Sequence, residues 1–128
     1  MPKDVISTNK APAAIGTYSQ AVRAGNLAFV SGQIPLIPET MEVVEGDIDA
    51  QIEQVFSNLS AICEAMGARL DDVVKFTVYL TDLVNFPKVN AVMEGRLTAP
   101  YPARAAVEVS ALPKGVNVEV DAIVALGS

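Results

Sequence analysis

The residue best suited to bind a small anion is Arg104, which lies in the segment 102–106 (PARAA). It is the one cation in a stretch of small and apolar residues, and small neighbours leave room for a ligand beside it. A guanidinium presents a rigid fork that matches a carboxylate through two hydrogen bonds. Strand alternation puts Arg104 on one face with Ala106 and Glu108. The alternative is a structural arginine that begins a strand and pairs with a nearby acid.

A proton-transfer group is expected at Glu119, which lies among the mostly apolar residues of the segment 116–125. A partly buried carboxylate can have a raised pKa and exchange protons with a substrate or with water. Asp121 follows two residues later on the same strand face and competes for this role. The alternative for Glu119 is an ordinary exposed strand residue, and spacing alone favours that alternative.

Two further segments carry polar groups beside glycine. Tyr18 follows Gly16-Thr17, so its phenol is a candidate ligand contact on a loop. The segment 31–33 (SGQ) is expected to end a strand and to offer a hydroxyl and close backbone N–H groups. The alternatives are a tyrosine that only packs and a segment that only terminates a strand.

The chain contains no histidine, which removes the commonest general base and the commonest metal ligand. Ser-His-Asp and Cys-His catalysis are therefore excluded, as are histidine-rich zinc sites. Any catalysis must use carboxylates, arginine, hydroxyls, backbone groups or water. Cys63 falls beside an apolar helical stripe, and we interpret it as a small buried hydrophobe. No segment resembles a phosphate-binding loop or a dinucleotide fingerprint.

Charge and composition bound the partners and the compartment. The formal net charge is −6 and the nine Lys and Arg residues are scattered, which weighs against nucleic acid. A single cysteine allows no intrachain disulfide and fits a reducing compartment. No apolar run approaches the ~20 residues of a transmembrane helix, and the N-terminus lacks the apolar stretch of a signal peptide. We therefore expect a cytoplasmic protein that binds neither nucleic acid nor membrane.

The elements that must position these residues are strands and two helices within one domain, residues 1–128. Segment 47–66 predicts an amphipathic helix, because apolar residues recur every three or four positions and Gly67 follows. Segment 85–97 predicts a second amphipathic helix with Pro87 in its first turn. Strands are predicted at 5–7, 19–23, 27–31, 73–80, 103–109 and 116–125.

This order, β-β-β-α-β-α-β-β, predicts an α+β fold in which two helices cover one face of a mixed sheet. Gly25-Asn26 is a tight-turn signal and predicts a hairpin between the second and third strands. The other sheet face must meet water or another subunit. With 51% hydrophobic and only 19% charged residues, the composition favours a subunit interface.

A set of segments that spans essentially the whole chain in order resembles the Rid family of reactive intermediate deaminases, also called the YjgF family. Each segment alone is weak evidence for the family, whereas the full set in this order is very specific for it. The matching segments are 13–21 (AAIGTYSQA), 29–36 (FVSGQIPL), 71–75 (DDVVK), 78–82 (VYLTD), 86, 89–90, 102–104 (PAR), 107–109 (VEV), 112–115 (LPKG) and 118–120 (VEV).

The resemblance implies a chorismate-mutase-like α+β subunit that assembles as a homotrimer, with sites in clefts between subunits. It implies hydrolysis of 2-iminobutanoate and 2-iminopropanoate to 2-keto acids and ammonia, with no metal and no organic cofactor. Such imines are released by pyridoxal-phosphate enzymes such as threonine dehydratase. Because an imine is already electrophilic, orientation and water placement would suffice without histidine.

Residue by residue, the resemblance implies that Arg104 clamps the substrate carboxylate. Glu119 would hold or activate the attacking water, or relay protons to the leaving nitrogen. Ala106 would offer backbone groups near the substrate or the water. The other implied substrate-binding residues are Tyr18, Ser31, Gly32 and Asn90.

Three positions depart from the family pattern. Thr17 stands where members commonly have proline, Leu97 replaces a frequent aromatic residue, and Ala106 stands where many members have cysteine. The change at Ala106 is expected to alter pocket size or water binding, and it removes a thiol from the site.

Other functions stay open beside the deaminase. A binding or regulatory module would hold a small carboxylate without turning it over, and Arg104 with Glu119 suits both functions. A ribonuclease or translation inhibitor is also ascribed to the family, but acidity and the lack of histidine count against it. A chaperone-like holdase is the fourth alternative. A pure binder would not need a placed water or a proton relay.

Overall fold

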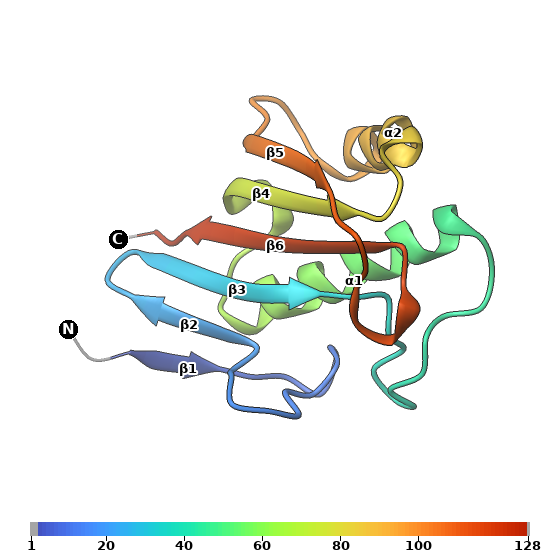
Figure 1. Cartoon of the computed structure of the whole chain (residues 1–128). Helices are drawn as coiled ribbons and strands as arrows, with labels where there is room; N and C mark the ends of the chain where they lie inside the picture. Colours follow the sequence, from blue (N-terminus) through green and yellow to red (C-terminus); the bar gives the residue numbers. More distant parts are fainter. Residues whose placement is uncertain (1–2, 128) are drawn as a thin grey trace.

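A six-stranded mixed sheet forms one layer of the computed structural model, which describes residues 3–127 (Figure 1). Its spatial order is β1-β2-β3-β6-β4-β5; β4 and β5 pair in parallel and the other neighbours are antiparallel. Two helices form the second layer, so the predicted α+β arrangement is confirmed. The strands are β1 (Asp4–Ile6), β2 (Ala21–Ala24), β3 (Leu27–Gln33), β4 (Val73–Leu80), β5 (Ala103–Glu108) and β6 (Val118–Ala125).

Helix α1 (Ile48–Ala65) packs across the back of the sheet in Figure 1. Asp47 caps its start, because the carboxylate accepts a 3.1 Å hydrogen bond from the Ala50 N–H. Gly67 follows its end with a φ of +77°, a conformation that glycine adopts at little cost. The apolar stripe predicted from the sequence is buried in the core: Ile52, Val55, Leu59 and Ile62.

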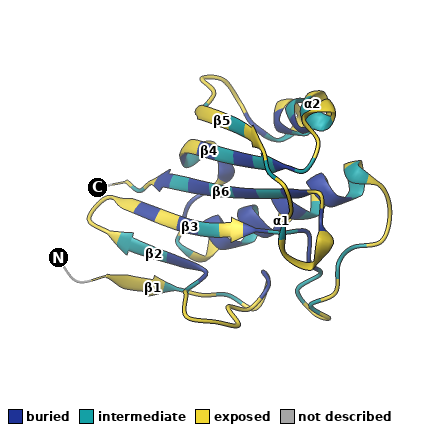
Figure 2. Ribbon diagram, viewed as in Figure 1, coloured by how far each residue is buried: buried dark blue, intermediate teal, exposed yellow. Residues whose placement is uncertain are grey.

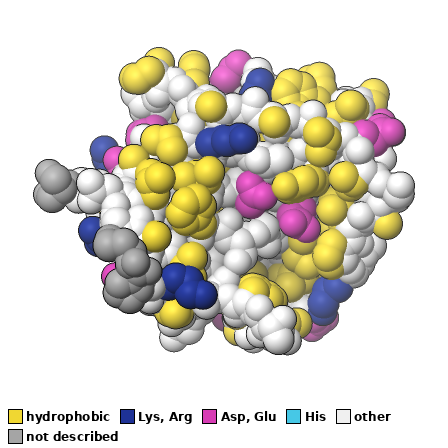
Figure 3. Space-filling view, turned by 60° about the vertical axis from the view of Figure 1, so that its left-hand side comes forward, with side chains coloured by type: hydrophobic (Ala, Val, Ile, Leu, Met, Phe, Trp, Pro, Cys, Tyr) yellow, Lys and Arg dark blue, Asp and Glu magenta, His cyan; other side chains and the backbone are white. Residues whose placement is uncertain are grey.

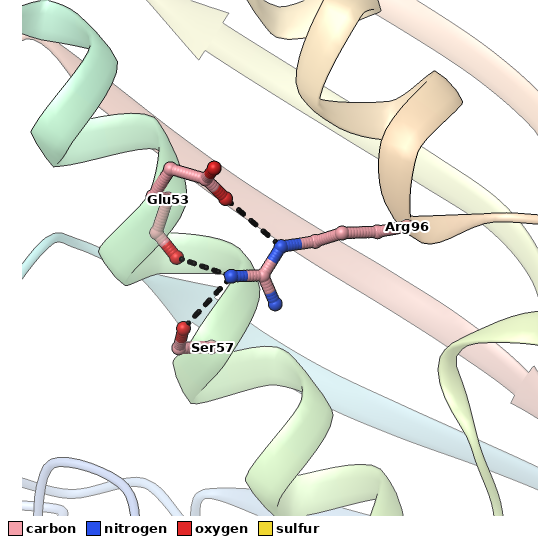
Figure 4. Close-up of polar contacts among 3 residues, drawn as sticks. All are labelled: Glu53, Ser57 and Arg96. Atoms are coloured by element: carbon pink, nitrogen blue, oxygen red, sulfur yellow. Dashed lines mark hydrogen bonds and ion pairs between the residues drawn. The ribbon is translucent and has the colours of Figure 1, made fainter.

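Helix α2 (Phe86–Arg96) has Pro87 in its first turn and buries Val89 and Met93. Arg96 at its end ties it to α1, as Figure 4 shows. Its Nε lies 3.0 Å from Glu53 Oε1, and its Nη2 donates to Ser57 Oγ at 3.0 Å and to the Glu53 carbonyl at 3.4 Å. These groups are partly exposed, so the ion pair contributes at most about 1 kcal/mol. The contact fixes the helix that carries Asn90.

The two faces of the sheet differ in what covers them. Along β6, Val118, Val120 and Val124 are fully buried against the helices, while Glu119 and Asp121 point to the opposite face. Figure 2 shows this alternation of burial along the strands. We call the side without helices the open face. Figure 3 shows hydrophobic patches around acidic groups and a recess, and the open face exposes large apolar side chains at Leu27, Phe29 and Val107.

Five of the six strands differ from the sequence prediction by one or two residues at one or both ends, and β4 alone has the predicted bounds. Two of the differences bear on the site. Strand β2 begins at Ala21 rather than at residue 19. The buried Gln20 just before it uses its side chain to bond the carbonyls of Thr8, Ala11 and Pro12. Strand β3 continues to Gln33 through a bulge, so the predicted bound at residue 31 is wrong, whereas the prediction that the segment 31–33 ends a strand is confirmed. A bulge inserts residues without ending the pairing.

Cys63 is buried on α1, which confirms its interpretation as a core residue. Burial, followed by the charges of Asp72 and Glu64, raises the pKa of its thiol to about 11. It therefore stays protonated at neutral pH. No helix within residues 3–127 combines the length and apolarity needed to cross a membrane.

Candidate functional site

Four of the predicted site residues line one cavity, which we call the Glu119 cavity. It has a volume of about 480 Å³ and lies where β3 ends and β6 begins. Much of its wall is apolar and comes from the loops that follow β1 and β3. The predicted residues Tyr18, Ser31, Gly32 and Glu119 are joined there by Pro12, Ala13, Ile15, Gln33, Ile34, Leu36, Met41, Pro113 and Lys114.

Glu119 reaches across from β6 to the backbone of Gly32 on β3. A Cβ added to Gly32 would overlap the carboxylate and lie 2.9 Å from its Cδ atom. Burial, and secondly the charge of Asp121, raises the pKa of the Glu119 carboxyl. Within residues 3–127 no donor forms a hydrogen bond with this carboxylate, so the group is available to a ligand or to water.

Asp121 is engaged elsewhere, although it shares the open face with Glu119. The Tyr79 hydroxyl donates a 3.0 Å hydrogen bond to Asp121 Oδ2. Burial and then this bond to Asp121 raise the pKa of the Tyr79 phenol. Asp121 does not line the Glu119 cavity. The geometry therefore favours Glu119 over Asp121 as the acid that meets a ligand.

The Ser31 hydroxyl is already committed as a donor. Its Oγ donates a 2.5 Å hydrogen bond to the Ser19 carbonyl, and its backbone N–H donates to the Gln20 carbonyl at 2.9 Å. Ser31 can therefore offer a ligand only an acceptor oxygen. Tyr18 is half-exposed on the loop before β2, and its hydroxyl accepts a 3.4 Å hydrogen bond from the Ile15 N–H. That leaves the phenol proton free to reach a ligand.

Buried amide side chains hold the cavity walls, and sequence analysis missed them. Gln20 binds the loop before β2, as described above. Asn58, only 1% exposed on α1, donates to the carbonyls of Ile34 at 3.3 Å and Leu36 at 3.0 Å. Gln51, also on α1, accepts from the Asn117 N–H at 2.9 Å. For Asn58 and Gln51 the available signal was an amide within or beside the apolar stripe of a helix.

Arg104 lines a second cavity of about 350 Å³ between β5 and α2, which we call the Arg104 cavity. Its guanidinium lies 4.6 Å from the centre of the Phe86 ring, and Nη1 donates a 2.8 Å hydrogen bond to Asn90 Oδ1. Within the described chain Arg104 forms no ion pair with a carboxylate. Nη1 also donates to the Met93 sulfur at 3.7 Å, so the Nε and Nη2 groups, which bond no described residue, are free for an anion. The other lining residues are Met93, Glu94, Tyr101 and Pro102.

Arg104 and Glu119 point to opposite faces of the sheet. Arg104 pairs in register with Phe76, which is buried under the helices, whereas Glu119 pairs with Tyr79 on the open face. One chain therefore does not bring the two charged groups together. Ala106 shares the helix-covered face with Arg104, packs partly buried against the core and lines neither cavity.

Comparison with known proteins gives a consistent family. A family model described as endoribonuclease L-PSP matches residues 8–126. A RutC family protein of Pyrococcus abyssi is 55% identical over 96% of this chain and 97% of its own length. The 2-iminobutanoate/2-iminopropanoate deaminase of Escherichia coli is 49% identical over 92% of this chain and 94% of its own.

A solved structure agrees with the family model and with the curated relatives. The crystal structure of RidA from an Antarctic Psychrobacter species superposes with a TM-score of 0.92 at 58% identity, over 96% of this chain and 99% of that one. The resemblance read from the sequence motifs is confirmed. The chain belongs to the Rid (YjgF) family, whose model bears the description endoribonuclease L-PSP.

Proposed function

We propose that this protein hydrolyses reactive 2-imino acids, such as 2-iminobutanoate and 2-iminopropanoate, to 2-keto acids and ammonia. The observation that carries the proposal is the Glu119 carboxylate, which lies in a mostly apolar cavity and bonds no donor among residues 3–127. A second cavity of the same chain presents Arg104 as a fork that can bind an anion. The deaminase name of the E. coli relative supports the same activity.

The reaction needs little beyond positioning. Arg104 binds the substrate carboxylate, and Glu119 accepts a proton from the water that attacks C2 of the imine. The C=N electron pair moves to nitrogen, and the proton held by Glu119 passes to that nitrogen, which gives a neutral carbinolamine. The Glu119 carboxylate then takes the carbinolamine O–H proton and delivers it to the nitrogen. The C–N bond breaks as the C=O bond forms, ammonia leaves, and the Glu119 carboxylate is restored. Tyr18, Ser31 and Gly32 line the Glu119 cavity, whereas Ala106 lines neither cavity and is given no role in the reaction.

The site is completed between chains. Because Arg104 and Glu119 point to opposite faces of one sheet, a substrate that touches both must lie between two copies. The exposed apolar side chains of the open face support association with a second copy. We propose a homotrimer of chorismate-mutase-like subunits in which Arg104 and Asn90 of one copy face the Glu119 cavity of the next.

The direct test generates 2-iminobutanoate in place with threonine dehydratase and follows 2-keto acid formation. We expect the protein to increase the rate above that of spontaneous imine hydrolysis. Several 2-imino acids are compared, with heat-denatured protein as the control. No acceleration with any of them would rule out the deaminase activity.

The alternative that the geometry favours next is a module that binds a small carboxylate without converting it. Arg104 hydrogen-bonded to Asn90 over the Phe86 ring would serve that function equally well. Saturable binding of 2-oxobutanoate, together with no imine hydrolysis, would favour the binding module. The ribonuclease function has no specific support in the geometry of either cavity.

A further inference from the structure

A cation other than Arg104, Lys114, lines the Glu119 cavity. The hydrolysis of a simple imino acid gives this cation no role. Lys114 belongs to the 3₁₀ turn Pro113–Gly115, which leads into β6. Its Nζ donates a 3.4 Å hydrogen bond to the carbonyl oxygen of Met41 on the loop after β3. Both residues line the cavity, and its charged lining residues are Glu119 and Lys114.

The backbone at this contact is strained from both sides. Lys114 has a φ of 57° and Met41 a φ of 61°, and these are the two non-glycine residues with positive φ within residues 3–127. Residues with a Cβ adopt this left-handed conformation only where the surrounding structure holds them, and such positions cluster at ligand-binding sites. Here the two strained residues meet across one cavity.

The distribution of charge and apolar surface defines what the cavity suits. Its volume of about 480 Å³ lies within the range of small-molecule pockets, so it has room for a side chain of several carbons. Ile34 and Leu36 provide apolar wall for methylene groups. An anionic end group is repelled by Glu119 and attracted by the Lys114 ammonium.

We propose that Lys114 is a specificity-determining residue that binds the distal carboxylate of dicarboxylic 2-imino acids, the class derived from acidic amino acids. The inference rests on the proposed function and narrows its substrate class. On binding, the Lys114 ammonium exchanges the Met41 carbonyl for a carboxylate oxygen, which makes a charge-assisted bond. The α-carboxylate is held by Arg104 of another copy, so each carboxylate has its own cation.

The test uses two stable keto acids that differ only at the far end of a five-carbon chain. 2-Oxoglutarate carries a carboxylate there and 2-oxopentanoate a methyl group. The affinities of the assembled full chain for both are measured by titration calorimetry, and the readout is their ratio. The variants are Lys114→Met, Lys114→Glu and Lys114→Arg, with Lys88→Met as a control that removes the same charge from α2.

We expect the wild type to bind 2-oxoglutarate more tightly than 2-oxopentanoate. Lys114→Met should lower this preference about tenfold or more, the worth of one charge-assisted hydrogen bond. Lys114→Glu should lower it further, Lys114→Arg should retain part of it, and Lys88→Met should leave it unchanged. Circular dichroism and light scattering confirm that the variants fold and assemble.

Two results overturn the inference. One is a wild type that does not prefer 2-oxoglutarate, and the other is a preference that stays within about twofold of wild type in Lys114→Met and Lys114→Glu. The outcome is separate from that of the proposed function. If binding depends on Lys114 but no imine is hydrolysed, the deaminase activity is ruled out and Lys114 still binds the distal carboxylate. If imines are hydrolysed but selectivity does not depend on Lys114, the deaminase activity stands and this inference is ruled out.

Discussion

Gly32 and the Glu119 carboxylate are in such close contact that a methyl group added at Gly32 should displace the carboxylate. Gly32→Ala places a Cβ in the space of the Glu119 carboxylate, and the backbone φ of Gly32 is not one that excludes alanine. We expect the imine hydrolase rate to fall roughly tenfold to a hundredfold, as for a misplaced catalytic group. Gly95→Ala is the matched control, since nothing lies within 4 Å of its added Cβ. Full activity in Gly32→Ala would contradict this placement of Glu119.

Glu119→Gln is expected to lower activity without lowering the stability of the fold. As the general base, Glu119 should contribute about 10²–10⁴ to the rate, and the variant should lose that factor. Wild-type activity should rise with pH as Glu119 ionises, through a pKa raised above its ordinary value by burial and by Asp121. The variant should lose this limb of the profile. An equal loss of activity in Glu64→Gln, on the exposed side of α1, would show that the effect is not specific.

The stability of the same variant follows from the direction of the shift. A carboxyl whose folded-state pKa is raised stabilises the fold below its unfolded pKa, and this contribution is lost as pH rises through the folded-state pKa. At neutral pH the Glu119 charge therefore destabilises the fold. We expect Glu119→Gln to unfold in urea at the same or a higher concentration than wild type at neutral pH. A variant that is less stable at neutral pH than at acid pH, relative to wild type, would contradict the sign.

Arg104→Ala tests the anchor for the substrate carboxylate. Loss of a charge-assisted pair should cost about 1.5–3 kcal/mol, which lowers kcat/KM roughly 10- to 150-fold. Arg23→Ala on β2 is the control, because Arg23 bonds only the Gly25 carbonyl among the described residues and lines neither cavity. An unchanged kcat/KM in Arg104→Ala would remove the residue from the site.

At the scale of elements, Asn58 ties α1 to the loop that leaves β3. Asn58→Ala leaves the carbonyls of Ile34 and Leu36 without this donor and opens space in a buried position. We expect a loss of about 2–4 kcal/mol in the free energy of unfolding, measured in urea at a fixed protein concentration. Glu64→Ala, at an exposed position of the same helix, is the control and should change it by less than about 0.5 kcal/mol. Equal effects of the two substitutions would contradict the role of Asn58.

The regular elements were predictable because their causes are local. The helix predicted at 47–66 is observed at Ile48–Ala65, since the Asp47 cap and Gly67 mark its limits in the sequence. Strand β4 has the predicted bounds, because its β-branched and aromatic run is continuous. The extension of β3 to Gln33 was missed, because a bulge depends on the partner strand β6 and leaves no local mark.

The site was predictable residue by residue but not as an arrangement. Arg104 and Glu119 stood out as charged groups among small or apolar neighbours. Their placement on opposite faces depends on which strands are neighbours, and β6 lies between β3 and β4 although it is last in the chain. The supporting bonds of Gln20 and Asn58 join residues 8 to 24 positions apart, so no local pattern reveals them.

At the scale of the whole molecule, the open face makes assembly testable. Light scattering should give the mass of a trimer, and Phe29→Glu should shift it towards the monomer, because the charge enters an apolar patch on β3. Glu64→Lys changes charge on the helix layer instead and should leave the mass unchanged. A monomeric wild type would contradict the proposal that the site is shared between copies.

Mixed assemblies of Arg104→Ala and Glu119→Gln chains test the shared site most directly. In such a mixture, an Arg104→Ala chain still supplies Glu119 and a Glu119→Gln chain still supplies Arg104. The two variants are unfolded together, refolded and assayed for imine hydrolysis beside each variant refolded alone. If the site lies between copies, random mixing in a cyclic trimer restores about a quarter of the intact sites, although each variant alone is nearly inactive. A mixture no more active than the average of the separate variants would contradict a site shared between chains.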